Sequence, residues 1–282
     1  NRFYEIVLGP SMVYSCAYWA DGATTLEQAQ EAKLELICRK LGLRAGMRLL
    51  DVGCGWGSLV LHAASRHGVS AVGVTVSREQ AVYAEKRVAD AGLADRVEIR
   101  LQDYRDVHDG PYDAISSVGM AEHVGEDRFG EYAAGLYELL APQGRVLNHM
   151  ISTREKGDRR GRRSSFIWHY VFPDGELLPV TTSMRALHGA GFEVRDMHAL
   201  REHYAKTLRC WVANLDASWD EAVSLAGLRR ARVWRIYMAG SAVAFEAGGI
   251  GVDQVLGVRM AADGSSGVPA TRDEWTVRKA TR

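Results

Sequence analysis

The sequence has no excess of charge of either sign. Lys plus Arg and Asp plus Glu each number 35 among its 282 residues, so the formal net charge is zero. Proteins that bind nucleic acid do so largely by neutralising phosphates with clustered basic side chains. The balanced composition does not favour that class of partner, and we expect no nucleic acid.

Cysteine is scarce. The four cysteines are Cys16, Cys38, Cys54 and Cys210, which lie far apart, with no CxxC pair and no Cys/His spacing that marks a zinc site. The pattern argues against both a disulfide framework and a metal centre, so we expect no metal. It suits a reducing compartment, and we expect a cytoplasmic protein.

Long hydrophobic runs are also missing. The longest apolar region near the C-terminus is interrupted by Arg235, Glu246 and Asp253, and the chain does not open with a signal-like segment. A chain of this length can bury one large core, or one domain with an appendage. It begins with Asn1 rather than Met, from which we expect the tail of a longer polypeptide.

What the chain does contain is a glycine-rich stretch. Residues 49–57 read Leu-Leu-Asp-Val-Gly-Cys-Gly-Trp-Gly. An apolar run that ends in Asp51 and then in alternate glycines predicts a buried strand turning tightly into a helix. The spacing GxGxG differs from the GxGxxG of dinucleotide-binding folds. It resembles motif I of class I S-adenosylmethionine (SAM) methyltransferases, in which the turn hosts the methionine end of SAM; a plain strand-to-helix turn is the alternative.

From residue 48 onward, apolar strands alternate with helices at the spacing of a doubly wound parallel sheet. An amphipathic helix precedes them, with Thr24 or Thr25 as its N-cap and Gly42 at its end. Ligands of such folds bind beyond the carboxyl ends of the strands. The predicted strands are 48–53, 71–75, 97–101, 113–117, 144–150 and 254–260, the predicted helices are 25–41, 58–67, 77–91, 128–140, 202–217 and 229–245, and 180–198 fits one more helix and strand.

Polar residues follow the second and third predicted strands. Ser77 and Gln80 have the spacing of a capping box, and Gln80 is also placed to serve a ribose as a neutral donor and acceptor. Asp103 is placed to accept a hydrogen bond from an adenine amino group, with Tyr104 beside the ring. These residues extend the predicted ligand site along the sheet edge.

One strong charge run spans residues 154–163, with six basic and two acidic side chains in ten positions. Three interpretations are open: a solvated loop, a contact with anionic lipid headgroups, or a nucleic-acid contact, which the lack of interleaved aromatic residues disfavours. The apolar and aromatic segment 166–173 follows directly. A basic loop next to an apolar segment suits an enzyme that binds at a membrane surface.

Several motifs together resemble the cyclopropane fatty acid synthase family, which includes the mycolic acid cyclopropane synthases and related fatty acid methyltransferases. The most specific are Tyr-Ser-Cys-Ala-Tyr at 14–18 and Gly-Met-x-Glu-His-Val-Gly at 119–125. The resemblance runs from about residue 3 to about residue 260. The matching stretches are 8–18, 50–57, 73–80, 103–105, 118–125, 149–151 and 170–173.

The resemblance implies an α/β fold of the class I SAM-dependent methyltransferase type, with a doubly wound, mostly parallel seven-stranded sheet. It also implies an N-terminal helical lid over 1–47 and a catalytic domain over 48–260, with a lipid-facing helical insertion at about 154–240. Residues 261–282 are then a polar C-terminal tail, and larger members carry an additional N-terminal domain. Including the two acids from the strand ends, the expected SAM-binding residues are Tyr14, Ser15, Asp51, Gly53, Gly55, Thr75, Gln80, Asp103 and Tyr104.

The family binds a bicarbonate ion in its active site. Taken alone, Cys16 is an ordinary buried thiol, and Glu122-His123 is a surface pair at a helix start, where we leave His123 as structural. By position in the resemblance, the bicarbonate ligands are Cys16, Glu122, His149, the backbone of Ile151 and Tyr204. An isolated alkene has no proton to remove first, so holding it against the sulfonium methyl supplies much of the acceleration. Attack leaves a carbocation, which needs a dry pocket and then a base.

The product stays open at this point. Loss of a methyl proton from the cation gives a cyclopropane, whereas a hydride shift before deprotonation gives a methylene-bearing chain that a reductase partner would convert to a methyl branch. The expected substrate is an unsaturated phospholipid acyl chain, reached by a peripheral protein at the inner face of the cell membrane. The double-bond position, headgroup preference and oligomeric state, a homo-oligomer included, are not decided by the sequence.

Two other classes of function are compatible with a SAM-binding fold. A non-catalytic lipid-surface binding protein with a vestigial SAM fold predicts loss of the Cys16, Glu122 and His149 set, which is intact. A small-molecule O- or N-methyltransferase would need no basic and aromatic lipid-facing segment, and it would turn over soluble acceptors.

Overall fold

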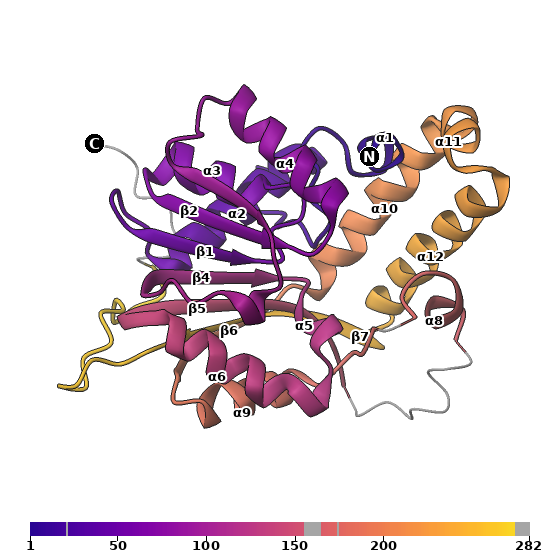
Figure 1. Ribbon diagram of the computed structural model, residues 1–282. Helices are drawn as coiled ribbons and strands as arrows, with labels where there is room; N and C mark the ends of the chain where they lie inside the picture. The colour runs from indigo at the N-terminus through magenta and orange to yellow at the C-terminus, as the bar shows by residue number, and fades with distance from the viewer. Residues whose placement is uncertain (21, 155–164, 174, 274–282) are drawn as a thin grey trace.

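A seven-stranded sheet crosses the middle of the molecule (Figure 1). The computed structural model describes residues 1–20, 22–154, 165–173 and 175–273. The strand order is β3-β2-β1-β4-β5-β7-β6, in which β7 runs antiparallel to β5 and β6 and the other neighbours are parallel. The strands are β1 (Arg48–Val52), β2 (Ser70–Thr75), β3 (Val97–Leu101), β4 (Tyr112–Val118), β5 (Leu140–Thr153), β6 (Glu193–Ala199) and β7 (Ile250–Val258). The predicted doubly wound, mostly parallel sheet is confirmed.

Strand β1 is buried on both faces of the sheet. Leu49 packs into the core on one face, while Leu50 and Val52 pack into the core on the other. Successive side chains of a strand point to opposite faces, so a continuous apolar run is what a doubly covered parallel strand needs. β1 pairs with both β2 and β4, which places the reversal of strand order, and the expected ligand crevice, at the end of β1.

Helices cover both faces of the sheet, α2, α3 and α4 on one and α6 and α9 on the other (Figure 1). Thr25 caps α2 as predicted, in a capping box with Gln28, and Gly42 ends the helix in the left-handed conformation. These helices are α2 (Leu26–Leu41), α3 (Ser58–His67), α4 (Arg78–Asp90), α6 (Phe129–Leu139) and α9 (Val180–Gly189).

A further group of helices lies beside one end of the sheet (Figure 1). α1 packs against α10 and α11, and α10 packs against α12. Their shared core joins Val7 and Cys16 of the N-terminal segment to Trp211 and Leu215 of α10. None of the helices in the described part of the chain is long and apolar enough to cross a membrane. The group comprises α1 (Arg2–Leu8), α8 (Phe166–Tyr170), α10 (Arg201–Ala217), α11 (Trp219–Ala226) and α12 (Leu228–Glu246). The remaining elements of the described chain are α5 (Ala121–Val124) and two short 3₁₀ turns (Tyr104–Asp106 and Glu126–Arg128).

The structure corrects several predicted bounds. β5 extends beyond the predicted 144–150 at both ends, and β7 starts at Ile250 rather than at residue 254. The longer strands pair Ser152 with Gly251, where an added Cβ would lie 2.9 Å from Ser152 Oγ. Glycine at position 251 therefore allows the two strands to approach closely there. α1, α8 and α11 lie where the sequence predicted no individual helix, and residues 155–163 of the basic run lie outside the described residues.

Candidate active site

The turn after β1 forms one wall of a cavity at the strand ends. Gly53, Gly55 and Gly57 have φ values of 78°, 55° and 81°, in the left-handed region that favours glycine. A Cβ on Gly55 would meet no atom within 4 Å, whereas a Cβ on Gly57 would lie 3.1 Å from that of Ala84. Gly55 therefore leaves room for a ligand, and Gly57 lets α4 pack closely.

This polar cavity has a volume of about 880 Å³. The ends of β1, β2 and β3 meet the N-terminal segment 12–15 around it. The structure brings together here all the residues that were predicted to bind SAM, namely Tyr14, Ser15, Asp51, Gly53, Gly55, Thr75, Gln80, Asp103 and Tyr104.

A lysine that the sequence analysis missed also lines the polar cavity. Lys33 of α2 is only 2% exposed, and its Nζ donates to Ser15 Oγ at 2.9 Å. Burial lowers the pKa of Lys33 to about 8. Burial likewise raises the pKa of Asp51, which accepts a bond from Ser116 Oγ at 2.6 Å, to about 6. The sequence did offer a sign of this residue. Lys33 lies seven residues after Leu26, on the apolar face of the predicted amphipathic helix, where a buried charge needs a partner.

Gln80 does not complete the capping box that was predicted for α4. Ser77 Oγ does accept from the backbone N–H of Gln80 at 3.3 Å, so the N-cap itself is confirmed. The side-chain Oε1 of Gln80 instead accepts from the Thr75 hydroxyl at 2.9 Å. This bond holds the amide at the end of β2, on the wall of the polar cavity.

Asp103 is held by its neighbour Arg105. Its carboxylate accepts from the Arg105 backbone N–H, Nε and Nη2 at 3.0, 2.9 and 2.7 Å, and these bonds keep the pKa of Asp103 below its usual value. Tyr104 packs edge-on against Tyr132, with ring centroids 5.5 Å apart. The adenine contact of Asp103 stays a prediction.

A second, mainly apolar cavity of about 790 Å³ adjoins the first. Its apolar walls come from α8, α10 and α12, for example through Phe166, Leu208 and Ala244. The structure brings together here all five predicted catalytic residues, namely Cys16, Glu122, His149, Ile151 and Tyr204.

Glu122 is a buried carboxyl with one oxygen bonded and one not. Its Oε1 accepts from the backbone N–H of Ile151 at 2.7 Å, and its Oε2 has no hydrogen-bond partner among the described residues. Burial raises the pKa of Glu122 to about 7. The side chain is 8% exposed, whereas His123 beside it is exposed, so the pair is not the surface pair that helix position alone suggested.

His149 of β5 is also buried, and only one of its two ring nitrogens has a hydrogen-bond partner among the described residues. The side-chain nitrogen of Gln254 lies 3.2 Å from His149 Nδ1, and Nε2 has no partner in the described part of the chain. Burial keeps the pKa of His149 well below its usual value, so the ring is neutral. If Gln254 donates to Nδ1, the ring proton is on Nε2, which then serves as a donor.

Cys16 and Tyr204 lie in the same wall. The Cys16 thiol donates to the carbonyl oxygen of Ala17 at 3.2 Å, and burial raises its pKa well above the usual value, so it stays a thiol. Tyr204 is 5% exposed and its ring stacks at a tilt on Phe245, with centroids 4.8 Å apart. Its pKa is likewise raised well above the usual value by burial.

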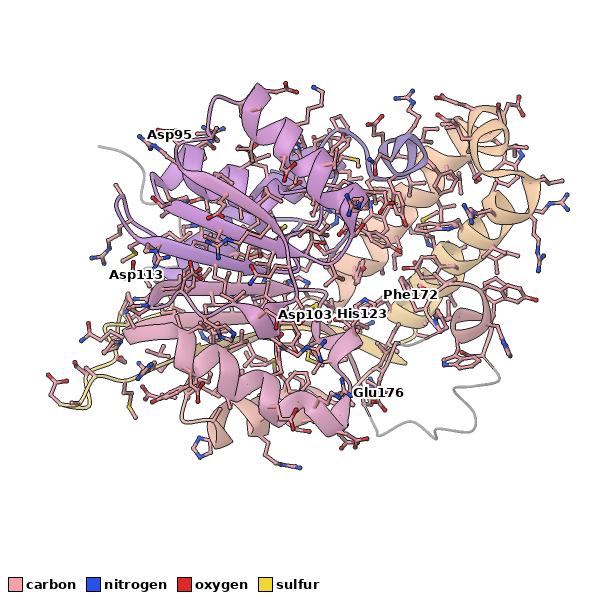
Figure 2. The ribbon with its side chains drawn as sticks, in the orientation of Figure 1. Asp95, Asp103, Asp113, His123, Phe172 and Glu176 are labelled. Carbon is pink, nitrogen blue, oxygen red and sulfur yellow. The ribbon has the colours of Figure 1, made fainter. Side chains whose placement is uncertain are left out.

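The two cavities meet at a shared set of residues. Figure 2 shows two of them, His123 and Phe172, on the side of the sheet that faces α8 and α12, and their rings pack edge-on at 6.2 Å. At the same junction, the Tyr14 hydroxyl lies 3.1 Å from that of Tyr237, a second residue that the sequence analysis missed. The shared lining residues are Tyr14, Ser15, Gly119, His123 and Phe172.

The sequence profile of the mycolic acid cyclopropane synthetase family matches residues 1–255. The chain belongs to this family. The motifs predicted this family and, with it, a fold of the SAM-dependent methyltransferase type.

Individual relatives agree with this assignment. A probable fatty acid methyltransferase of Mycobacterium tuberculosis is 45% identical over 269 residues, covering 95% of this chain and 62% of the relative. The cyclopropane-fatty-acyl-phospholipid synthase of Escherichia coli is 41% identical over 256 residues, covering 91% of this chain and 64% of the relative. The chain thus spans less than two thirds of the length of each.

A solved structure of the family confirms the fold class. The mycolic acid cyclopropane synthase CmaA1, crystallised with SAH and CTAB, has a TM-score of 0.85 at 34% identity, with 91% of this chain and 93% of that chain covered. The seven-stranded, mostly parallel sheet is that of the class I SAM-dependent methyltransferases.

Proposed function

We propose that this protein transfers a one-carbon unit from SAM to the double bond of an unsaturated phospholipid acyl chain and gives a cyclopropane fatty acid. The observation that carries the proposal is the junction of the two cavities. A polar cavity beside the glycine turn adjoins an apolar cavity. The apolar cavity contains two buried polar side chains, Glu122 and His149, each with one polar atom that has no hydrogen-bond partner among the described residues. The polar cavity suits SAM, and the apolar cavity suits an acyl chain beside a small polar group.

The polar cavity fits SAM by its chemistry. The open space over Gly55 and the positive φ values of the turn let a ligand approach the backbone. Lys33, fixed by Ser15, places a cation in the cavity for the carboxylate of the methionine end, and Gln80 lies at the end of β2 for the ribose. SAM, when bound, supplies an electrophilic methyl group.

The apolar cavity fits a bicarbonate ion at Glu122 and His149. His149 Nε2 and Glu122 Oε2 are buried polar atoms without partners among the described residues, and a buried polar atom without a partner is costly. With its pKa near 7, Glu122 can carry a proton and donate to an anion rather than repel it. Bicarbonate, when bound, supplies a base for the proton that the product must lose.

Ile151, Cys16 and Tyr204 then take supporting roles. The backbone N–H of Ile151 already bonds Glu122 Oε1, so we assign it to holding the carboxyl in place. The Cys16 thiol is directed at a backbone carbonyl and gives the cavity a wall without charge. The ring of Tyr204 helps to keep water out, which matters because a carbocation would react with it.

A branched product is a second candidate. The first relative above is named a fatty acid methyltransferase, and so is a Pseudomonas putida protein that is 43% identical over 277 residues. This likeness favours a methylene-bearing acyl chain, formed from the same cation after a hydride shift. That product would call for a reductase partner.

The surface around the apolar cavity supports a membrane-bound substrate. Ile236 lines the cavity and is 57% exposed, Val243 lies seven residues further along α12 and is 53% exposed, and Tyr170 of α8 is 53% exposed. We propose that these residues contact the bilayer at the inner face of the cell membrane. In this arrangement, residues 1–47 form the lid over SAM, 48–260 the catalytic domain and 261–282 a tail.

The proposal is tested by turnover with vesicles. The protein, SAM and vesicles of monounsaturated phospholipid are expected to give SAH and an acyl chain heavier by one CH₂, while vesicles of saturated phospholipid give neither. SAH formed from soluble amines or phenols, with no change in the lipid, would replace the proposal with an N- or O-methyltransferase. Removing dissolved carbon dioxide should slow the lipid reaction, and added bicarbonate should restore it.

A further inference from the structure

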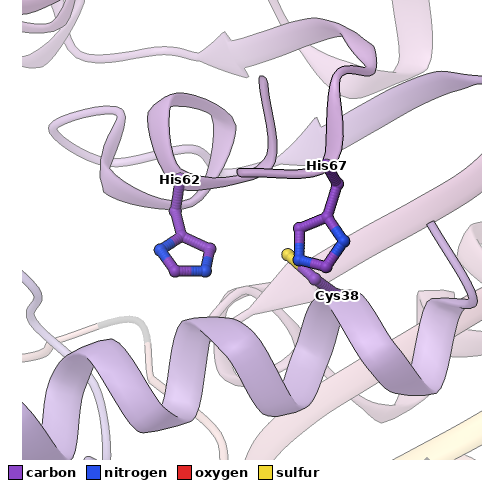
Figure 3. Close-up of side chains that lie close together, drawn as sticks. All are labelled: Cys38, His62 and His67. Atoms are coloured by element: carbon purple, nitrogen blue, oxygen red, sulfur yellow. The ribbon is translucent and has the colours of Figure 1, made fainter. Parts of the chain in front are cut away.

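Four metal-ligating side chains lie together between α2 and α3. Glu35 Oε2 lies 3.2 Å from His62 Nε2 and 3.0 Å from His67 Nε2. The Cys38 sulfur and one nitrogen of each imidazole all lie within 4.8 Å of one another. Figure 3 shows the two imidazole rings and the thiol pointing into the same space. None of the four lines the polar or the apolar cavity, so the cluster is separate from the site described above.

We propose that Glu35, Cys38, His62 and His67 bind one zinc ion. Two ligand atoms on a tetrahedral zinc are about 3.4 Å apart for metal–ligand distances of about 2.1 Å. The two Oε2–Nε2 distances are already close to that value, and the Cys38 sulfur, which lies within 4.8 Å of one nitrogen of each imidazole, has to move inward to complete the site. Imidazole, thiolate and carboxylate are the ligands that zinc takes in proteins.

The charges of the four ligands suit a divalent cation. One carboxylate and one thiolate neutralise it, and the two imidazoles are neutral ligands. The bonds from His62 and His67 hold the pKa of Glu35 well below its usual range, so that this side chain is ionised. Burial raises the pKa of the Cys38 thiol, but a coordinating divalent cation removes that proton. Binding therefore releases one thiol proton to solvent, while each imidazole keeps its single proton on the nitrogen that does not ligate the metal.

The surroundings of the cluster favour a structural site with access from solvent. Arg39 Nε lies 3.4 Å from Glu35 Oε1, so it engages the oxygen that does not face the imidazoles, as an outer-shell partner does. The side chains of His62, His67 and Glu35 are 10%, 16% and 23% exposed, which gives an ion a way in. Four protein ligands leave no open position, which is typical of structural zinc.

The proposal revises the expectation of no metal. Cysteine spacing gave no sign of the site, because its ligands come in two pairs on different helices, three residues apart on α2 and five apart on α3. A bound ion would tie α2, which carries Lys33, to α3, which begins after the glycine turn. The inference does not depend on the proposed lipid reaction.

The experiment measures metal binding directly. The purified protein is freed of metal with a chelator and titrated with Co²⁺, with Zn²⁺ as competitor. We expect one Co²⁺ per chain, with the thiolate-to-metal band and the strong visible bands of tetrahedral cobalt, and a higher Tm with Zn²⁺. His67→Gln should weaken zinc binding by more than the roughly 10–100-fold that loss of an outer-shell partner costs. Cys38→Ala should remove the thiolate band.

Matched controls are Cys210→Ala and His188→Gln, which lie outside the cluster and should leave the spectrum unchanged. Absence of stoichiometric cobalt or zinc binding would overturn the proposal and leave Glu35 as a simple acceptor for two imidazoles. Binding that survives His67→Gln unchanged would also overturn it. Because His67 is partly exposed, that variant decides the question even if Cys38→Ala does not fold.

Discussion

Glu122 is a buried carboxyl in the cavity to which we assign the bicarbonate ion. One carboxyl oxygen is fixed by the backbone of Ile151, and the other is buried without a partner among the described residues. Burial brings its pKa close to neutrality, a property common among catalytic carboxyls. Because of this raised pKa, substitution of Glu122 tests both the proposed mechanism and the pH dependence of the free energy of unfolding.

Replacing Glu122 by Gln should abolish most turnover while leaving SAM bound. The amide keeps the bond from Ile151 but cannot exchange a proton, and loss of general acid–base function costs roughly 10²–10⁴-fold in rate. SAM affinity should stay unchanged, because Glu122 lines only the apolar cavity. Turnover assays and calorimetric titration with SAH measure the two effects. Glu131→Gln, an exposed carboxyl that lines neither cavity, is the control, and wild-type turnover in Glu122→Gln would contradict the assignment.

Glu122 should also make the fold less stable as the pH rises. Its pKa is about 7 in the folded protein against 4.5 for an exposed glutamate, so between these values the folded state binds more protons than the unfolded state. The free energy of unfolding therefore falls as the pH rises through that window, by at most ~3 kcal/mol from this group. Asp51, with its pKa raised to about 6, acts in the same direction.

Denaturant unfolding at several pH values between 4.5 and 8 isolates the contribution of Glu122. The wild type should lose stability across the window by up to ~3 kcal/mol more than Glu122→Gln does. An identical pH dependence in the two proteins would show that Glu122 is not the buried titrating group described here.

At the scale of elements, alanine substitutions at two glycines test whether SAM binds at the β1–α3 turn. Gly55→Ala adds a Cβ in open space within the polar cavity, so SAM affinity should fall by about 10-fold or more, with a strain cost of ~1–2 kcal/mol. Gly92→Ala adds a Cβ at a φ of 66°, also with no atom within 4 Å, but outside both cavities. It should cost similar stability and leave SAH binding intact; equal loss of affinity in both variants would refute the placement of SAM.

Helix α12 offers a corresponding test of the apolar cavity. Gly240→Leu places a large side chain at a lining position where a Cβ meets no atom within 4 Å. Lipid turnover should drop at least ~10-fold, SAH affinity should hold, and the better helix former should add up to ~1 kcal/mol of stability. Gly130→Leu on α6, also without a close neighbour and outside both cavities, should keep full activity. Equal activity in the two variants would show that the acyl chain binds elsewhere.

The sequence predicted elements well where periodicity and caps agree, as in α2 with its Thr25 cap and Gly42 end. Prediction from the sequence was wrong where contacts between distant parts of the chain determine the local structure. β7 begins among glycines because Gly251 lies opposite Ser152 across the sheet, and the side chain of Gln80 bonds Thr75 rather than closing a capping box. Lys33 was missed because its partner comes from the distant N-terminal segment.

At the scale of the whole molecule, motifs assigned residues to SAM and to catalysis but did not show that two cavities exist. That division depends on how α8, α10 and α12 pack beside the sheet and how the N-terminal segment packs on α10. Their contacts join parts of the chain some two hundred residues apart, as in the Tyr14–Tyr237 pair. A local sequence pattern does not show which residues so far apart in the chain will contact each other.

The most direct test of the central claim is proton NMR of acyl chains released after the protein has acted on monounsaturated phospholipid vesicles with SAM. Our account predicts new upfield signals of cyclopropane ring methylenes. Vinyl signals of an exocyclic methylene would instead establish the branched product, which mass alone cannot distinguish because both products gain one CH₂. Acyl chains without any added carbon would contradict the account.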